Sequence, residues 1–430
     1  MSALKVQEAM LPEFDYLSPQ QIQRSIEHMY MEKIVAKVEV GSPIEFVIPK
    51  VHNFTALHDT KLELRVKIMK ADLSTAIDNT TADKVGVANN ILHSAFDKLE
   101  VFINGHSKEN QTNYAQRAYI DTLTSYRHDA LTVRGALQGW SKDTAGKMDV
   151  VDVTATTNAG FKDRSALYKS SGVVTLMGRI HSDIMMQGLC MPPDTEIKIS
   201  LQPSSSQFAL MAPTGGTYKL VITEAILWVA RVAVCPSLQL ALQKVFEHRT
   251  MTIPMRQVKV KTHTIASGVT ETTLSNIFDN DLPDRFLVGF LDNKSWGAGA
   301  KIDANPFDFA HQSVNFLQAS RGDQQIPTTA YTPDFTSTKY IREYMALLEE
   351  FNADEGDTTI GITKEEFAAG YALFPFRVVT RSRGGDAVGP PASGGISLTL
   401  KFSTATAAVL NLVLYYESRT ALELTPPKTE

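Results

Sequence analysis

A short phrase of the form Arg-x-Tyr-(Ile/Met)-x-x-Leu occurs once in each half of the chain, at Arg117–Leu123 and at Arg342–Leu348. In both copies the tyrosine and the leucine are four residues apart, so on a helix their side chains would share one face. The copies begin 225 residues apart in a chain of 430 residues. A repeat at that distance predicts a domain built twice, because solenoids repeat every ~20–50 residues. The motif residues that we expect on two related helices, in a structural role, are Arg117, Tyr119, Leu123, Arg342, Tyr344 and Leu348.

Strand patterns dominate the rest of both halves. Leu62–Ile68 and Val258–Thr264 alternate apolar and polar residues, which is typical of strands with one buried face. The long segment Tyr218–Val234 is mostly apolar, as expected for one or two buried strands. Further strands are predicted within residues 31–50, 99–103, 173–180, 196–201, 285–291, 313–319, 371–379, 396–402 and 408–417.

The order of these segments is the same in each half. Several strands lead to a strand that ends in a glycine turn, Asn104-Gly105 in the first half and Arg321-Gly322-Asp323 in the second. A polar gap follows, then a short helix near residues 115–126 or 338–352, and then more strands. This order predicts an all-β protein of two tandem jelly-roll β-sandwich or barrel domains, a double jelly roll with short helices in its loops.

We expect the chain to begin with an arm that carries a short amphipathic helix. Ser18 and Pro19 form a helix start, and apolar residues follow at helical spacing. The arm could pack on its own domain or dock on a neighbouring subunit, with Ser18, Ile22, Ile26 and Met29 as the residues concerned. The predicted parts are the arm (1–30), a first jelly roll (31–236) with a long loop (127–171), a second jelly roll (237–424) and a frayed tail (425–430).

The charge and the cysteine content of the chain argue against several classes of protein. The net charge of −5 argues against a dedicated nucleic-acid-binding protein, which would carry a basic face. Cys190 and Cys235 have no metal-ligand spacing, so we expect buried reduced thiols and no metal or cofactor. No apolar run approaches the ~18 residues of a membrane span, and the N-terminus lacks the apolar centre of a secretion signal. We therefore expect a cytosolic or nuclear protein.

The sequence contains no convincing catalytic motif. Gly139–Met148 comes nearest to a phosphate-binding loop, but its spacing is wrong and methionine stands where serine or threonine must reach Mg²⁺. Dinucleotide-binding, nucleophile-elbow and zinc-protease motifs are also missing. We therefore predict a protein that is not an enzyme and that acts through its shape and contacts. A jelly-roll carbohydrate-binding or hydrolytic protein and a minor structural or adhesion protein remain alternatives, although the three tryptophans do not cluster as a sugar platform would.

Several blocks of the sequence resemble one family. They lie in order over most of residues 30–424 and are Asn90–Gly105, Tyr114–Leu123, Asn305–Phe309, Val314–Phe316, Tyr340–Met345, Gly370–Phe376, Leu398–Phe402 and Leu412–Glu417. In these blocks the chain is similar to the major capsid proteins of Polinton/Maverick elements and adintoviruses. It departs from them at Tyr114-Ala-Gln-Arg117, where the family tends to have Tyr-Pro-Tyr-Arg, and the match is weak in 127–171 and 203–217.

The resemblance implies a capsid protein that forms homotrimers with a pseudo-hexagonal outline. Such capsomers would tile an icosahedral shell around a DNA genome, beside neighbouring capsomers, penton and minor capsid proteins. It implies a place in the virion, no sequence-specific nucleic-acid binding and no membrane span. The long loop 127–171 would form an outer crown or clasp neighbours, and the arm near Ser18–Tyr30 would lie at the inner base.

Overall fold

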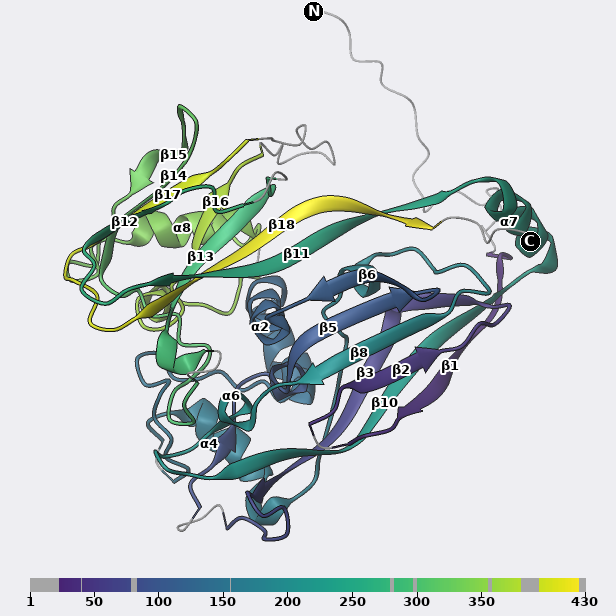
Figure 1. Cartoon of the computed structure of the whole chain (residues 1–430), viewed down its shortest axis with the longest axis horizontal. Coiled ribbons are helices and arrows are strands. Elements are labelled where there is room, and N and C mark those ends of the chain that lie inside the picture. The colour runs from purple at the N-terminus through teal and green to yellow at the C-terminus, as the bar shows by residue number, and fades with distance from the viewer. Residues whose placement is uncertain are drawn as a thin grey trace, which may run out of the picture.

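The computed structural model describes residues 23–39, 41–78, 83–154, 156–278, 282–296, 300–354, 358–379 and 394–424. Two β units lie side by side, the first coloured purple to teal and the second green to yellow in Figure 1. Each unit contains two four-stranded sheets, and all the strand pairs in these sheets are antiparallel. The two-unit, all-β prediction is confirmed.

The first unit pairs its strands in the orders β1-β10-β3-β7 and β2-β8-β5-β6. Strand β2 shows why these residues form such a layer: its burial alternates perfectly, with Ile44, Phe46 and Ile48 inside and the residues between them exposed. The strands are β1 (Ile26–Ala36), β2 (Ile44–Ile48), β3 (Phe54–Lys70), β5 (Phe96–Ile103), β6 (His106–Gln111), β7 (Val174–Gly178), β8 (Ile197–Pro203) and β10 (Tyr218–Val234). A small extra sheet pairs β4 (Gly86–Val87) with β9 (Leu210–Met211).

The second unit repeats this arrangement strand for strand. Its sheets have the orders β11-β18-β13-β16 and β12-β17-β14-β15. In sequence order within each unit, both units therefore pair strands 1-8-3-6 in one sheet and 2-7-4-5 in the other. The strands are β11 (Met251–Ile265), β12 (Glu271–Leu274), β13 (Arg285–Asp292), β14 (Val314–Arg321), β15 (Gln324–Tyr331), β16 (Phe374–Arg377), β17 (Ser397–Phe402) and β18 (Leu410–Leu424).

Both copies of the Arg-x-Tyr phrase lie on helices at the same place in their units. Helix α2 (Tyr114–Ser125) follows β6, and α8 (Ile341–Glu350) follows β15. The glycine turns precede these strands: Asn104-Gly105 joins β5 to β6, and Gly322 lies between β14 and β15. The remaining helices are α1 (Ile91–Ser94), α3 (His128–Ala130), α4 (Ala159–Leu167), α5 (Asp183–Met186), α6 (Ser206–Ala209), α7 (Pro236–His248) and α9 (Lys364–Phe367), with short π or 3-10 turns at Leu131–Gly135, Ala136–Gln138, Lys169–Ser171 and Asn293–Ser295.

The prediction of a helix in the arm is wrong for the part of the arm that the structure describes. Ile26 and Met29 lie on strand β1, which pairs antiparallel with β10 from Ile26 to Ala36, so the first unit begins inside the segment expected to be the arm. The helical spacing was a coincidence, and pairing with a long apolar strand decided the conformation. Ser18 and Ile22 lie outside the described residues.

A helix that the sequence reading missed joins the two units. Pro236 is the first residue of α7, where a proline costs no helical hydrogen bond. Leu242 and Phe246 of α7 pack on the outer face of β3 and β10, against a small buried cluster that includes Phe54 and Val232. No helix in the described part of the chain is long and apolar enough to cross a membrane.

Candidate functional site

Arg117 of α2 lies at the centre of a buried charge cluster. Its guanidinium donates to Asp183 of α5 at 2.6 Å, to Glu109 of β6 at 3.3 Å and to Asp121 of α2 at 3.4 Å. All four side chains are almost wholly removed from solvent. One cation therefore faces three carboxylates in the interior, an arrangement that is stable only if every partner stays in place.

The carboxylates of this cluster titrate differently because their partners differ. Burial and the charge of Asp183 raise the pKa of Glu109 to about 6. Burial also raises the pKa of Asp183. Burial would raise the pKa of Asp121 too, but the hydrogen bond from His181 and the charge of Arg117 together lower it below its usual value.

A raised carboxylate pKa can mark a general base, so the surroundings of Glu109 decide its role. Its carboxylate accepts hydrogen bonds from the hydroxyl of Ser182 at 2.5 Å and from the backbone N–H groups of Asp183 and Ile184 at 2.9 and 3.2 Å. These donors, with Arg117, occupy both oxygens of Glu109. The cluster therefore has the character of a structural network.

The network continues into the second unit. Asp121 accepts a hydrogen bond from the hydroxyl of Tyr415 on β18 at 2.5 Å, and Arg256 of β11 lies 3.5 Å from the same carboxylate. Glu417 of β18 then bonds both Arg256 at 3.3 Å and Arg285 of β13 at 2.7 Å. Alternating charges thus run from Asp121 of the first unit across one sheet of the second unit, from its edge strand β11 to β13.

The junction between the two units also covers the free edge of a sheet in the second unit. Strand β11 is the edge of its sheet, so one side of its backbone needs partners from elsewhere. Asp183 accepts from the N–H of Val258 at 3.1 Å, and the side-chain amides of Gln111 and Asn113 donate to the carbonyls of Val258 and Val260 at 3.4 and 3.3 Å. Side chains of the first unit therefore take the place that a fifth strand of this sheet would have beside β11.

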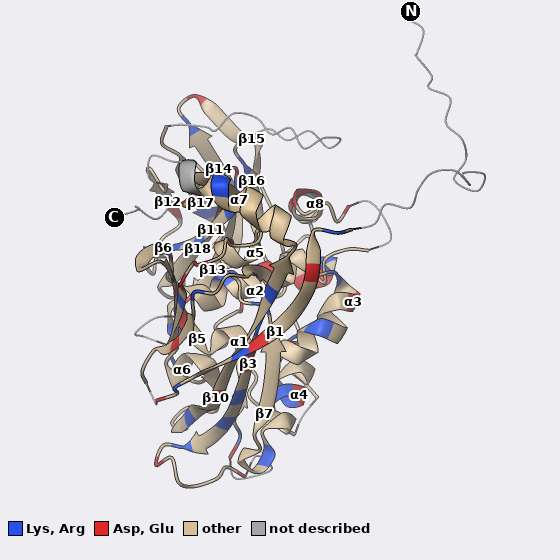
Figure 2. Ribbon diagram, turned by 90° about the vertical axis from the view of Figure 1, so that its right-hand side faces the viewer, with Lys and Arg blue, Asp and Glu red and all other residues tan. Residues whose placement is uncertain are grey.

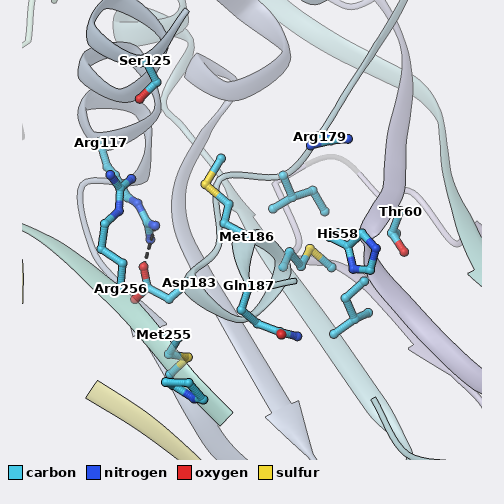
Figure 3. Close-up of a pocket in the computed structure, with 14 residues that line it drawn as sticks. His58, Thr60, Arg117, Ser125, Arg179, Asp183, Met186, Gln187, Met255 and Arg256 are labelled. Atoms are coloured by element: carbon cyan, nitrogen blue, oxygen red, sulfur yellow. Dashed lines mark hydrogen bonds and ion pairs between the residues drawn. The ribbon is translucent and has the colours of Figure 1, made fainter. Parts of the chain in front are cut away.

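A cavity of about 470 Å³ opens beside this junction. Figure 3 shows Arg117, Asp183 and Arg256 together on one side and His58 and Thr60 of β3 on the other. Of the charged side chains in its wall, Arg117 and Asp183 bond each other, and Arg256 contacts Asp121 of the same network. Arg179 lies outside the network, 3.7 Å from Asp59. Among the residues that the structure describes, no group of histidine, cysteine, aspartate or glutamate side chains is arranged to hold a metal ion.

The long segment 127–171 fastens the two units together. Lys142 makes an ion pair with Glu366 at 2.5 Å, and the hydroxyl of Tyr371 donates to the carbonyl of Asp143 at 2.9 Å. Lys294 lies 3.0 Å from Asp149. The sequence predicted an exposed loop or a contact with neighbours, whereas these contacts are with the second unit of the same chain.

The two copies of the repeated phrase have different surroundings. Tyr119 stacks on Phe307 of the second unit, with ring centres 4.1 Å apart, and Leu123 is buried beside it. On α8, Arg342 donates to the carbonyls of Thr329 and Ala330, and Tyr344 is only partly buried. The first copy therefore lies in the junction between the units and the second on the outer side of the molecule.

Nothing in the spacing of Glu109 and Asp183 along the chain indicated that they would meet Arg117.

The cysteines and tryptophans considered in the sequence do not form a binding site. Cys190 and Cys235 are free thiols, and both are half-buried, not fully buried as expected. Trp140 is buried against Tyr119, and Trp228 donates to Glu63 at 2.8 Å, so neither belongs to an exposed sugar platform. Basic and acidic residues are interspersed over the face shown in Figure 2.

No protein-family model matches the sequence, and no curated protein is similar to it. Among solved structures, the chain is similar to the Sputnik virophage structure, with 12% identity over 100% of this chain and 95% of that one and a TM-score of 0.58. It is also similar to the Faustovirus major capsid protein (8% identity, 95% and 92% covered, TM-score 0.56) and the mavirus major capsid protein (10%, 100% and 98%, 0.52). The chain has the double jelly-roll fold. In this double jelly roll, each eight-stranded unit is one jelly roll, and the charge network and segment 127–171 hold the two jelly rolls together.

Proposed function

We propose that this chain is a major capsid protein. Three copies form a capsomer with a pseudo-hexagonal outline, and the capsomers tile an icosahedral shell around a DNA genome. The shared fold with the Faustovirus and mavirus major capsid proteins supports this proposal.

The observation that carries the proposal is the strand-for-strand repeat of one jelly roll in a single chain. Three chains with two similar jelly rolls each would supply six similar units around a threefold axis. A nearly sixfold tile can then be built from one gene product. The buried network around Arg117 supports the same reading, because a tile needs a fixed angle between its units.

The remaining parts of the proposal concern partners and place. Neighbouring capsomers, penton and minor capsid proteins would contact the outer sides of the trimer. Residues 1–22 would act as an arm at the capsomer base, and the assembled protein would be found in virions built inside the host cell. No catalytic step is part of this function.

Light scattering after size-exclusion chromatography tests the proposal, together with electron microscopy of the expressed protein. We expect a particle of three 47.4 kDa chains and, at higher concentration, tiles or closed shells. A mass of one chain at every concentration, salt and pH would refute the proposal.

A further inference from the structure

Two surfaces of this chain correspond to the two halves of its own internal junction, yet no described residue of the chain covers either of them. Inside the chain, α2 and its neighbours cover the free edge of β11. The counterpart of α2 is α8, and the counterpart of β11 is β1, the first strand and sheet edge of the other jelly roll. In Figure 1, α8 and β1 lie on opposite sides of the molecule, so one chain cannot bring them together.

The helix α8 is exposed where α2 is buried. Counted from the arginine of the repeated phrase, Met345 corresponds to Ile120, and Ile341 corresponds to Gln116. Ile120 is 1% exposed and belongs to the same buried cluster as Val258 of β11. Met345 is 40% exposed and Ile341 50%. The outer face of α8 therefore presents apolar side chains at positions whose counterparts on α2, Gln116 and Ile120, are buried.

Strand β1 shows the complementary exposure. Met29, Met31 and Val35 alternate along it, with exposed fractions of 52%, 45% and 57%. Among the described residues, β10 is the only strand paired with β1, so its other edge has free backbone groups. A long exposed edge with apolar side chains favours association with another chain.

We propose that the β15–α8 corner of one copy docks on the free edge of β1 in the next copy. The contact repeats between chains the junction that the β6–α2 corner makes with β11 within the chain. It joins two different surfaces of identical chains, so successive copies associate head to tail and a closed ring has cyclic symmetry. The inference rests on the proposed function, because it names the contact that would close the trimer.

Cysteine cross-linking tests the contact directly. The background is the Cys190→Ser, Cys235→Ser variant, which removes both native thiols. Met345→Cys is combined in turn with Met29→Cys, Met31→Cys or Val35→Cys, and mild oxidation is followed by a non-reducing gel. We expect covalent dimers and trimers for at least one of these pairs and a single-chain band for each cysteine alone. The control replaces Met345→Cys with Val133→Cys, whose parent valine is 70% exposed on segment 127–171.

Charge substitutions give a second readout that needs no cross-link. The double variant Ile341→Asp, Met345→Asp should shift the measured mass from three chains to one, because these side chains are exposed in the isolated chain and folding is unaffected. Val133→Asp should leave the trimer intact. An unchanged circular dichroism spectrum establishes that the double variant is folded.

The outcomes separate this inference from the function on which it rests. If the natural chain forms trimers, no cysteine pair with Met345→Cys cross-links, and the double aspartate variant is still trimeric, the contact is wrong and the capsid proposal stands. Cross-links from β1 to Val133→Cys instead would place a different surface on β1 and overturn the contact as well. A natural chain that never exceeds the mass of one copy overturns both.

Discussion

Replacement of Arg117 by methionine tests whether the buried charge cluster holds the two jelly rolls together. Methionine retains much of the length and apolar bulk of the side chain but leaves Glu109, Asp121 and Asp183 buried without their shared cation. Removal of one partner from a buried ion pair costs about 3–5 kcal/mol, because the remaining charge stays in the interior. At roughly 2–4 °C per kcal/mol for units of about 200 residues, the melting temperature should fall by roughly 6–20 °C.

The chain supplies its own matched control. Arg342 is the same residue of the same phrase, but it is exposed and donates only to the carbonyls of Thr329 and Ala330. Arg342→Met should therefore cost at most about 1 kcal/mol, in line with ordinary hydrogen bonds. Differential scanning fluorimetry of both variants beside the natural chain measures the difference.

The destabilisation caused by Arg117→Met should also depend on pH. Burial raises the pKa of Glu109 to about 6, so at pH 5.5 this carboxyl can take up a proton and relieve part of the unpaired charge. The fall in melting temperature caused by Arg117→Met should accordingly be smaller at pH 5.5 than at pH 8. Equal melting temperatures for Arg117→Met and Arg342→Met, or a loss that grows on acidification, would refute this account of the junction.

Three further predictions concern other parts of the molecule. Burial and the neighbouring His181 hold the pKa of His93 well below its usual 6.5, so the folded state should lose ~1.4 kcal/mol of stability for each pH unit below 6.5. In urea titrations at several pH values, His93→Gln should make stability less dependent on pH, whereas replacement of the exposed His106 by glutamine should not. A Cβ at Gly160 would lie 2.2 Å from the carbonyl oxygen of Lys142, so Gly160→Ala should lower the free energy of unfolding by about 1–3 kcal/mol, while Gly188→Ala, with open space around it, should be neutral in the same assay. Deletion of residues 1–22 should leave folded trimers by light scattering but impair closed shells in electron micrographs, and a truncated chain that fails to fold would contradict the proposed arm.

Strand positions were predictable because their signal is local. Tyr218–Val234 is β10 to the residue, because a long apolar run indicates a buried strand. Leu62–Ile68 lies within β3, since a sheet with one buried face imposes alternation on the sequence itself. The duplicated order of segments was also visible, and both repeated phrases lie on helices. Short polar strands such as β6 and β12 were missed, because neither has an apolar face that alternation could reveal.

Residues 26–31 carry a pattern that suits either a helix or a strand, and only the tertiary structure decided between them. Pairing with β10 made them a strand, because the edge of an existing apolar sheet offers backbone partners that an isolated short helix lacks. The sequence by itself thus determined which segments become strands, their duplicated order and the helix that follows each glycine turn. The tertiary structure alone decided that Arg117 is buried among carboxylates while Arg342 in the same phrase faces solvent. The physical reason is that burial depends on what packs against a helix: the second jelly roll covers α2, and nothing in the described part of the chain covers the outer face of α8.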